Sequence, residues 1–347
     1  CQACHGPGQT HLEWAEKQDE APGNEDGSDG LLVDYSGNDS KYQVDACAPC
    51  HSRRARIKDS WRHFGPFLDQ FRPETLIPRL YYADGQILDE VYVYGSFLQS
   101  KMYEKGVRCT NCHDPHSAKL WVSENAVCTQ CHQLQPMEGF PTLLQKDYDT
   151  PDHHFHPEGS EGAQCVNCHM PERTYMVVDP RRDHSFRIPR PDLSPALETP
   201  NACDGCHTDR SEEWASNAVL DWYGKRTPEE PHYGEYLAAG RSGNREGEEA
   251  LAQLASRQGE TAIVRATALQ LLRNFREPEM AAPLKAIGDD EPLIRMVAVA
   301  NLDRLGAQAR VRNAGKLLAD PVRPVSYTHL RAHETVLVIS YAVFCLK

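Results

Sequence analysis

The sequence lacks a surplus of basic residues: its 347 residues include 37 Lys and Arg against 50 Asp and Glu, a formal net charge of −13. Proteins that bind nucleic acids need the opposite balance, because much of their affinity comes from neutralising phosphates. We therefore expect no nucleic-acid partner. Apolar runs of membrane-spanning length are also missing, since the run at residues 335–346 is too short to cross a bilayer. We expect no transmembrane segment.

The sequence is rich in pairs of cysteines that are followed directly by a histidine. Twelve of its 13 cysteines form six Cys-x-x-Cys-His motifs. Two thiols one helical turn apart can form thioethers with the two vinyl groups of a haem, and the adjacent histidine can ligate the iron. Neither disulfides nor structural zinc sites need a histidine after every cysteine pair. We therefore predict six haem c groups, attached through Cys1, Cys4, His5, Cys47, Cys50, His51, Cys109, Cys112, His113, Cys128, Cys131, His132, Cys165, Cys168, His169, Cys203, Cys206 and His207.

The other axial positions have enough histidines to fill them. The predicted proximal ligands are the six motif histidines: His5, His51, His113, His132, His169 and His207. Because Met/His ligation raises the reduction potential of a haem, a supply of second histidines favours a low-potential chain of bis-His haems. His232 lies beyond the motif-bearing residues. The candidate distal ligands are His11, His63, His116, His153, His154, His156 and His184.

Spacing restricts which haem each candidate can serve. His116 follows His113 by only three residues and cannot easily reach the opposite face of the same porphyrin. It should therefore ligate a neighbouring haem, and the same holds for His11 after His5. Such cross-ligation would hold adjacent haems in an array. Two basic runs nearby are interpreted as partners for haem propionates or as a means of steering an anion: Arg53, Arg54, Arg56, Lys58 and Arg62; and Arg181, Arg182, Arg187 and Arg190.

Composition divides the chain into regions. Residues 1–207 hold all six motifs and 31 Asp and Glu against 19 Lys and Arg. So many haems would leave little room for a side-chain core, so we expect porphyrins to fill the interior. The predicted fold class is mainly α, with a haem-packed multihaem cytochrome c domain of short helices, long loops and few strands. Residues 87–94 and 174–179 are the strand candidates. Residues 208–245 are expected to be a helical linker.

Residues 246–323 show a weak internal repeat. Residues 263–272 match residues 293–302 with an offset of 30, and both have apolar residues at helical spacing. This pattern favours a HEAT-like α-solenoid, with a plain helical bundle as the alternative. Solenoids commonly dock other proteins, so this region is the predicted binding site for a redox partner.

Both ends of the sequence are unusual for a natural protein. It begins inside a motif, without an initiator methionine or a secretory leader. Because a protein with c-type haems should be exported, we interpret the missing leader as truncation and expect a periplasmic or otherwise extracytoplasmic location. Residues 325–347 resemble translated sequencing-adapter DNA and are interpreted as an artefact. The alternative is an apolar strand or helix that closes the fold.

The motif-bearing residues resemble a known group of proteins. CHGPGQTH, GVRCTNCHDPH, and CVNCHMP followed by DPRRDH resemble multihaem cytochromes of the hydroxylamine oxidoreductase and cytochrome c nitrite reductase class. Residues 1–323 also resemble bacterial multihaem cytochromes with C-terminal HEAT or tetratricopeptide repeats. In octahaem members a CHGPG motif binds the third haem and the next haem is catalytic. The resemblance therefore implies a fragment with the last six of about eight haems, and a candidate catalytic haem at His51. Nitrite reductases have Lys where this chain has His51.

These observations predict electron transfer through an array of covalently bound haems. The alternative is an oxidoreductase that acts on a small inorganic nitrogen or sulfur compound, such as nitrite or hydroxylamine, at one open haem. That alternative requires an iron without a protein ligand on its second face. Redox proteins are the predicted partners.

Overall fold

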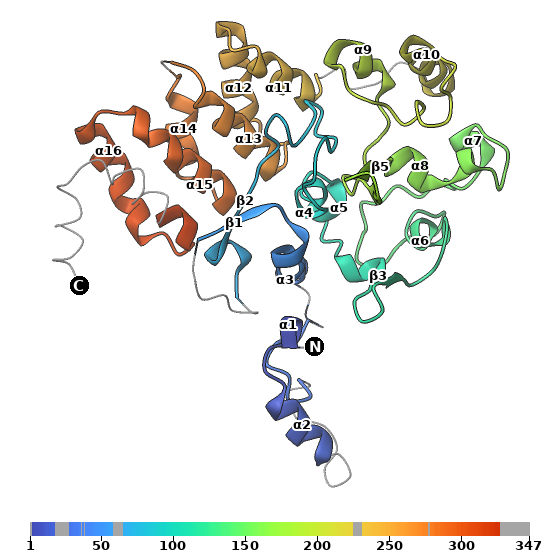
Figure 1. The fold of residues 1–347 in the computed structure, drawn as a ribbon, viewed down its shortest axis with the longest axis horizontal. Coiled ribbons are helices and arrows are strands. Elements are labelled where there is room, and N and C mark those ends of the chain that lie inside the picture. The colour runs from blue at the N-terminus through green and yellow to red at the C-terminus, as the bar shows by residue number, and fades with distance from the viewer. Residues whose placement is uncertain are drawn as a thin grey trace.

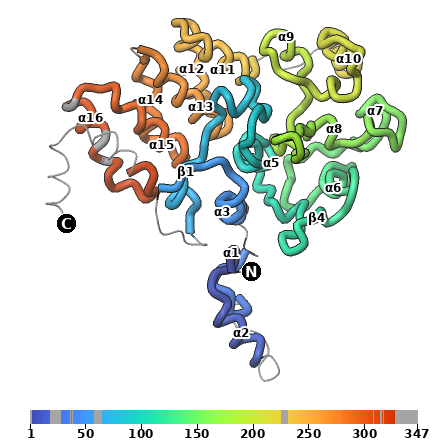
Figure 2. The backbone as a smooth tube through the Cα atoms, in the orientation of Figure 1, coloured from blue at the N-terminus to red at the C-terminus, as the bar shows by residue number. Residues whose placement is uncertain are grey.

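The computed structural model describes residues 2–17, 28–35, 37, 39–57, 65–224, 231–276 and 278–326. It is mainly helical with few strands, which confirms the broad fold class. Figure 1 shows an array of helices on one side of the molecule and a loop-rich body on the other. The tube in Figure 2 shows α1 (Gln2–His5) and α2 (Gln9–Glu16) leading away from the body as an arm.

The loop-rich body consists of short elements. Its helices and 3-10 turns are α3 (Ser40–His51), η1 (Phe67–Asp69), α4 (Tyr94–Phe97), α5 (Lys101–Glu104), η2 (Cys109–Asn111), α6 (Ala126–Thr129), α7 (Pro151–His154), η3 (Glu161–Ala163), α8 (Cys165–His169), η4 (Pro191–Leu193) and α9 (Ser194–Leu197). Its strands form three antiparallel pairs: β1 (Arg54–Arg56) with β2 (Phe71–Pro73), β3 (His113–Asp114) with β4 (Lys119–Leu120), and β5 (Glu172–Tyr175) with β6 (Asp179–Arg182).

The two strand predictions have different outcomes. Residues 174–179 cover the end of β5, the start of β6 and the turn between them. The prediction of a strand at residues 87–94 is wrong. Ile87 forms only an isolated bridge with Tyr81, and Tyr94 begins α4. Tyr92 has a φ of 60°, which takes the backbone out of the extended region.

The helical array follows the last motif. Its elements are α10 (Glu212–Tyr223), α11 (Tyr233–Arg241), α12 (Arg245–Ser256), α13 (Ala262–Leu272), α14 (Ala281–Ala286), α15 (Pro292–Asn301), η5 (Leu302–Arg304), α16 (Ala307–Ala314) and η6 (Gly315–Ala319). The two copies of the sequence repeat lie in α13 and α15, which pack against each other. Pro292 occupies the first turn of α15, where its missing N–H has no intrahelical partner to lose.

An ion pair recurs with the repeat. Arg265 on α13 donates to Asp289 (2.6 Å), and Arg295 on α15 donates to Asp320 (2.7 Å). In both pairs the side chains are largely buried, and each aspartate lies in the segment leading into the next repeat. Arg265 also donates to the carbonyl of Ala255 (3.1 Å), so it connects three successive segments.

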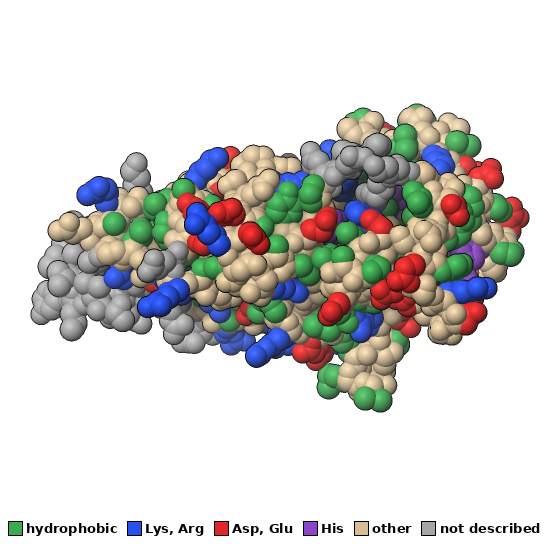
Figure 3. Space-filling view, turned by 90° about the horizontal axis from the view of Figure 1, so that it is seen from above, with side chains coloured by type: hydrophobic (Ala, Val, Ile, Leu, Met, Phe, Trp, Pro, Cys, Tyr) green, Lys and Arg blue, Asp and Glu red, His purple; other side chains and the backbone are tan. Residues whose placement is uncertain are grey.

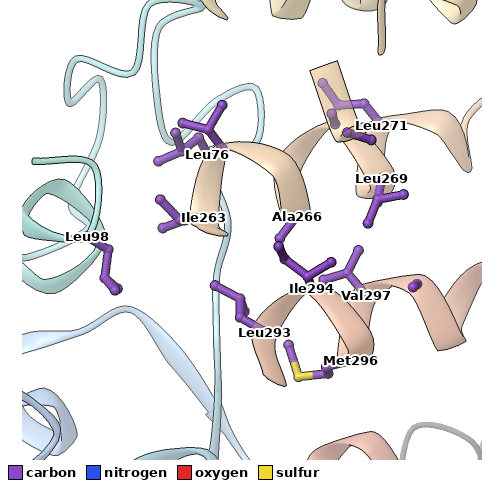
Figure 4. Close-up of a cluster of buried hydrophobic side chains, with 14 of the residues drawn as sticks. Leu76, Leu98, Ile263, Ala266, Leu269, Leu271, Leu293, Ile294, Met296 and Val297 are labelled. Atoms are coloured by element: carbon purple, nitrogen blue, oxygen red, sulfur yellow. The ribbon is translucent and has the colours of Figure 1, made fainter. Parts of the chain in front are cut away.

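The hydrophobic core extends from the helical array into the body. In Figure 4, Leu76 and Leu98 of the body lie beside Ile263 of α13, while Leu293 and Ile294 of α15 face the same cluster. Polar contacts reinforce this junction, since the Leu76 N–H donates to the Thr267 hydroxyl (3.0 Å). The segment between the second and third motifs therefore packs as part of the helical half.

Beyond this junction, side-chain packing nearly disappears. All residues from 101 to 170 are described, and Ala163 is the one buried residue among them. Three of the six motifs lie within this stretch, at Cys109–His113, Cys128–His132 and Cys165–His169. Here the chain alone does not provide the dense interior that stabilises a folded domain.

The charged side chains are unevenly distributed over the surface. On the face shown in Figure 3, acidic side chains gather toward the body, while Lys and Arg are more frequent over the helical array. Among the described residues, no helix combines the length and apolarity needed to cross a membrane. Residues 327–347 of the predicted adapter-derived segment lie outside the description, whereas Val325 is buried in the core cluster.

We predict that Arg265→Met lowers the free energy of unfolding by about 3 kcal/mol, because it leaves the carboxylate of Asp289 buried without its partner. Thermal denaturation followed by circular dichroism at a helical wavelength measures the loss. Arg245→Met is the matched control, since its pair with Glu249 is exposed and is worth only a few tenths of a kcal/mol. Equal stabilities for the two variants would contradict the role assigned to the buried pair.

Candidate haem-binding site

Local helical structure brings the cysteines of a motif together. The second motif occupies the last turn of α3, a helix that begins where Asp39 accepts the N–H of Tyr42 (3.1 Å). The fifth motif forms α8. In each case one turn separates the two cysteines, so both side chains project toward the same side of the helix. Cys1 of the first motif lies outside the described residues.

Thiols of successive motifs are neighbours. The side chains of Cys47 in the second motif and Cys109 in the third are hydrogen-bonded. The same is true of Cys128 in the fourth motif and Cys165 in the fifth. Groups attached to these paired motifs would therefore lie side by side.

Charge effects show how the pairs continue into a series. The Cys112 thiol of the third motif lies near the Cys131 thiol of the fourth, and burial followed by this neighbouring thiol raises the pKa of Cys112. Burial and then the Cys168 thiol of the fifth motif raise the pKa of Cys203 in the sixth motif to about 11. The second to sixth motifs thus form a series in chain order.

Tyr35 lies between the first two motifs. Its hydroxyl donates to the carbonyl of Cys4 (2.8 Å), and its ring meets that of His5 edge-on with centroids 5.5 Å apart. Burial raises its pKa to about 12, with smaller contributions from Tyr42, Cys4 and Cys47. The first motif is therefore beside the second.

Four motif histidines face a second imidazole. His5 faces His116 with ring centroids 6.3 Å apart and planes inclined by 13°. The other pairs are His113 with His184 (6.3 Å, 24°), His169 with His153 (6.2 Å, 4°), and His207 with His156 (6.1 Å, 43°). In every pair the second histidine comes from the segment around another motif or between two motifs.

The spacing of these pairs fits one metal ion between two rings. An imidazole nitrogen lies about 2 Å from a bound first-row metal ion, and about 1 Å from the centre of its own ring. Two imidazoles on opposite sides of one iron therefore have centroids about 6 Å apart. Ordinary stacking between aromatic rings gives no reason for four separate pairs to have the same centroid distance, whereas a shared metal ion does. The residues present thus fit haem with two axial histidines.

Hydrogen bonds leave the second ring nitrogen of several histidines available. The Nδ1 atoms of His5, His169 and His184 each lie 2.9 Å from a backbone carbonyl oxygen, of Val33, Arg187 and Arg182 respectively. His156 forms the same kind of bond with the carbonyl of His154. An Nδ1–H donated to a carbonyl fixes the tautomer and orients Nε2 toward a metal, as metal-ligating histidines commonly do.

Burial favours the neutral form of these rings. It lowers the pKa of His113, aided by the charge of His51, and lowers the pKa of His184. Burial and then the charge of His169 lower the pKa of His153 to about 4. A neutral imidazole is the form that binds metals.

The remaining histidines have other surroundings. His11 stacks on Trp14 and bonds through Nδ1 to the carbonyl of Asp29 (2.6 Å). Nδ1 of His154 accepts the N–H of His156. His232 caps α11. His63 lies outside the described residues. Among the residues that are described, neither His51 nor His132 has a second imidazole opposite it at the spacing of the four pairs.

Within the described ranges, no three His, Cys, Asp or Glu side chains converge in a group suited to holding a metal ion. Structural zinc sites need four such ligands in a tetrahedron.

The second basic run is paired with the protein's own carboxylates. Arg187 lies between Asp84 (3.6 Å) and Asp183 (3.5 Å), and Arg190 donates to Asp192. Arg181 and Arg182 likewise form ion pairs, with Glu90, Asp179 and Glu172. Their role in this structure is to hold the chain after the fifth motif, a role that the sequence interpretation omitted.

Aromatic residues around the histidines were also missed in the sequence. Trp214 and Trp222 of α10 contact His207 and His156, with centroids 4.8 and 6.1 Å away. Tyr148 and Tyr223 contact His153. For Trp214, Trp222 and Tyr223, the aromatic content of residues 212–223, shortly after the sixth motif, was a signal that could have been used. For Tyr148 the sequence offers no such signal.

Comparisons with known proteins give limited matches. No protein-family profile matches the chain. It is 26% identical over 274 residues to the dissimilatory sulfite reductase MccA of Wolinella succinogenes, covering 65% of this chain and 32% of that protein. The chain therefore spans about a third of this relative. The outer cell wall cytochrome OcwA has a similar structure over 88% of this chain and 70% of its own, with 15% identity and a TM-score of 0.45. The motifs and the weak match to MccA support a multihaem c-type cytochrome.

Proposed function

We propose that this chain is part of an extracytoplasmic multihaem cytochrome that transfers electrons through six covalently attached haems. The observation that carries the proposal is the set of four histidine pairs with ring centroids 6.1–6.3 Å apart, beside cysteine pairs from successive motifs. Haem c, when bound, supplies an iron that exchanges single electrons at a potential set by its axial ligands and surroundings.

The chain's residues divide the task of holding the haems. In each motif the two cysteines would form the thioethers and the histidine would be the proximal ligand. His116, His184, His153 and His156 would be distal ligands for the haems of His5, His113, His169 and His207 respectively. Closed axial positions on both faces suit electron transfer, because no small molecule can then reach the iron.

The neighbouring motifs would give the electrons a continuous route. Cys47 and Cys109, and likewise Cys128 and Cys165, are in contact. The helical array of α11–α16 is proposed as a HEAT-like solenoid that docks a redox partner, on the basis of its repeated helices and its recurring Arg–Asp pairs.

We expect the chain, expressed with an export signal and a haem-ligation system, to carry six haems. Each attachment motif provides the two thiols and the histidine that ligation needs. Intact mass and the pyridine haemochrome assay count them independently. Replacing Cys165 and Cys168 by Ala should give five haems. A wild-type chain with two haems or fewer would contradict the proposal.

Removing a distal histidine should open one iron. In His116→Ala we expect one ferric haem to change from low spin to high spin, because the haem of His5 loses its second imidazole. Electron paramagnetic resonance of the oxidised protein detects the change. His116 is exposed, so the substitution leaves the packing intact. His232→Ala is the control, since His232 caps α11, and it should give no high-spin signal. An unchanged spectrum for His116→Ala would rule out this pairing.

An enzymatic function is the second candidate. The match to a dissimilatory sulfite reductase favours it. Among the described residues no second imidazole lies opposite His51 or His132, and His63 lies outside those residues. We propose that one of these two haems has an open face that binds a small inorganic nitrogen or sulfur compound. His51 is preferred on the resemblance to octahaem enzymes, and His63 is the local residue that would close its second face.

The two functions predict different responses to added ligands. If one haem is open, the oxidised wild-type protein gives a high-spin signal that cyanide converts to low spin, and nitrite or sulfite perturbs it. In the closed arrangement the spectrum shows only low-spin haems and does not respond. His63→Ala then separates the sites: it creates a new cyanide-sensitive signal if His63 ligates the haem of His51.

A further inference from the structure

The imidazole of His153 is held by two tyrosines that lie outside all haem motifs. The ring of Tyr148 meets it edge-on, with centroids 5.0 Å apart and planes inclined by 87°. The ring of Tyr223 meets it at 6.1 Å and 66°. Contacts from two edge-on rings restrict rotation of the imidazole about its χ2 bond, a torsion that is otherwise broad.

Tyr223 also forms hydrogen bonds with the same residue. Its hydroxyl donates to the His153 carbonyl and lies 3.3 Å from His153 Nδ1. The phenol oxygen can therefore accept Nδ1–H, which leaves Nε2 for a metal. In His5, His169 and His184 the corresponding partner is a backbone carbonyl. His153 instead depends on a side chain from α10, a helix that follows the last motif.

The position of Tyr223 is itself fixed. The neighbouring residue Trp222 stacks on Phe155 with centroids 4.7 Å apart and planes inclined by only 3°. Phe155 ends α7 with a φ of 56°, which turns the chain directly after His153 and His154. Because α10 is anchored to the segment that carries His153, Tyr223 cannot move away from the imidazole independently.

The ring plane of His153 is the one most nearly parallel to its partner. It makes an angle of 4° with His169, compared with 13°, 24° and 43° for the other three pairs. In a ferric haem, parallel axial imidazoles split the iron d orbitals that interact with the ring π systems. Inclined imidazoles leave these orbitals closer in energy. The angle between the two rings is therefore visible in the spectrum of the iron.

We propose that Tyr148 and Tyr223 are positioning residues that hold the His153 imidazole parallel to that of His169. They thereby set the spectrum and the reduction potential of the haem bound between these histidines. The edge-on rings fix the plane, and the Tyr223 hydroxyl increases electron donation by accepting Nδ1–H. This inference rests on the proposed function, since it requires a haem at His169.

Electron paramagnetic resonance and redox titration of the six-haem chain test the proposal. Tyr223→Phe keeps the edge-on ring and the neighbouring stack but removes the hydroxyl. We expect the midpoint potential of one haem to rise, because its axial imidazole loses a hydrogen-bond acceptor and becomes a weaker donor. Tyr148→Ala removes an edge-on ring that contacts both His153 and the motif histidine His132. We expect the rhombic low-spin signal of the haem between His153 and His169 to shift toward a more anisotropic shape, and this signal is identified as the one whose potential changes in Tyr223→Phe. Tyr148→Phe should leave that signal in place.

Tyr236→Phe is the matched control, because it makes the same chemical change on α11, where Tyr236 packs under Arg257. It should change neither the potentials nor the spectrum. If Tyr223→Phe and Tyr148→Ala retain six haems with wild-type spectra and potentials, the inference is wrong while the proposed function stands. Loss of a haem in either variant also overturns it, because the tyrosine would then be needed for attachment. A wild-type chain that lacks a haem at His169 would instead overturn the proposed function.

Discussion

Between residues 101 and 170 the chain has almost no interior of its own. A polypeptide segment of this length normally buries many apolar side chains, and the free energy of that burial offsets the entropy lost on ordering the chain. Here Ala163 alone is buried. The histidine pairs and neighbouring cysteines of this region are the groups that would hold a large flat apolar cofactor. On the proposed function, porphyrins are that group, and stability in this half depends on haem attachment.

The helical half, in contrast, has a conventional core of buried apolar side chains. Its interior consists mainly of Leu, Ile, Val and Ala side chains on α11–α15, and the same cluster continues into the body, chiefly at residues 67–98. The boundary between the two kinds of packing therefore does not coincide with the end of the motif-bearing residues. Residues such as Leu76 lie between two motifs in sequence, yet they pack with α13.

Some of this architecture was predictable. The repeat at 263–272 and 293–302 indicated helices, because apolar periodicity reports the buried face directly, and α13 and α15 lie there. The predicted strand at 87–94 failed, because alternating apolar residues do not reveal a backbone turn such as that at Tyr92. The motifs predict proximal histidines from local spacing alone. The partners of those histidines depend on long-range contacts, which spacing constrains only by exclusion, as for His116.

The long-range histidine pairs also have a consequence for how such a chain matures. On the proposed extracytoplasmic location, the motif of His5 leaves the cytoplasm before the imidazole that faces it, which belongs to His116, beyond the third motif. Likewise His113 waits for His184, which follows the fifth motif. On the proposed ligation, early haems would pass through a stage with one vacant axial face, exposed to stray ligands and oxidants. The order in which the motifs are synthesised therefore differs from the order in which their histidine pairs are completed: His169 has its partner His153 already in place, whereas His113, synthesised earlier, is completed only by His184.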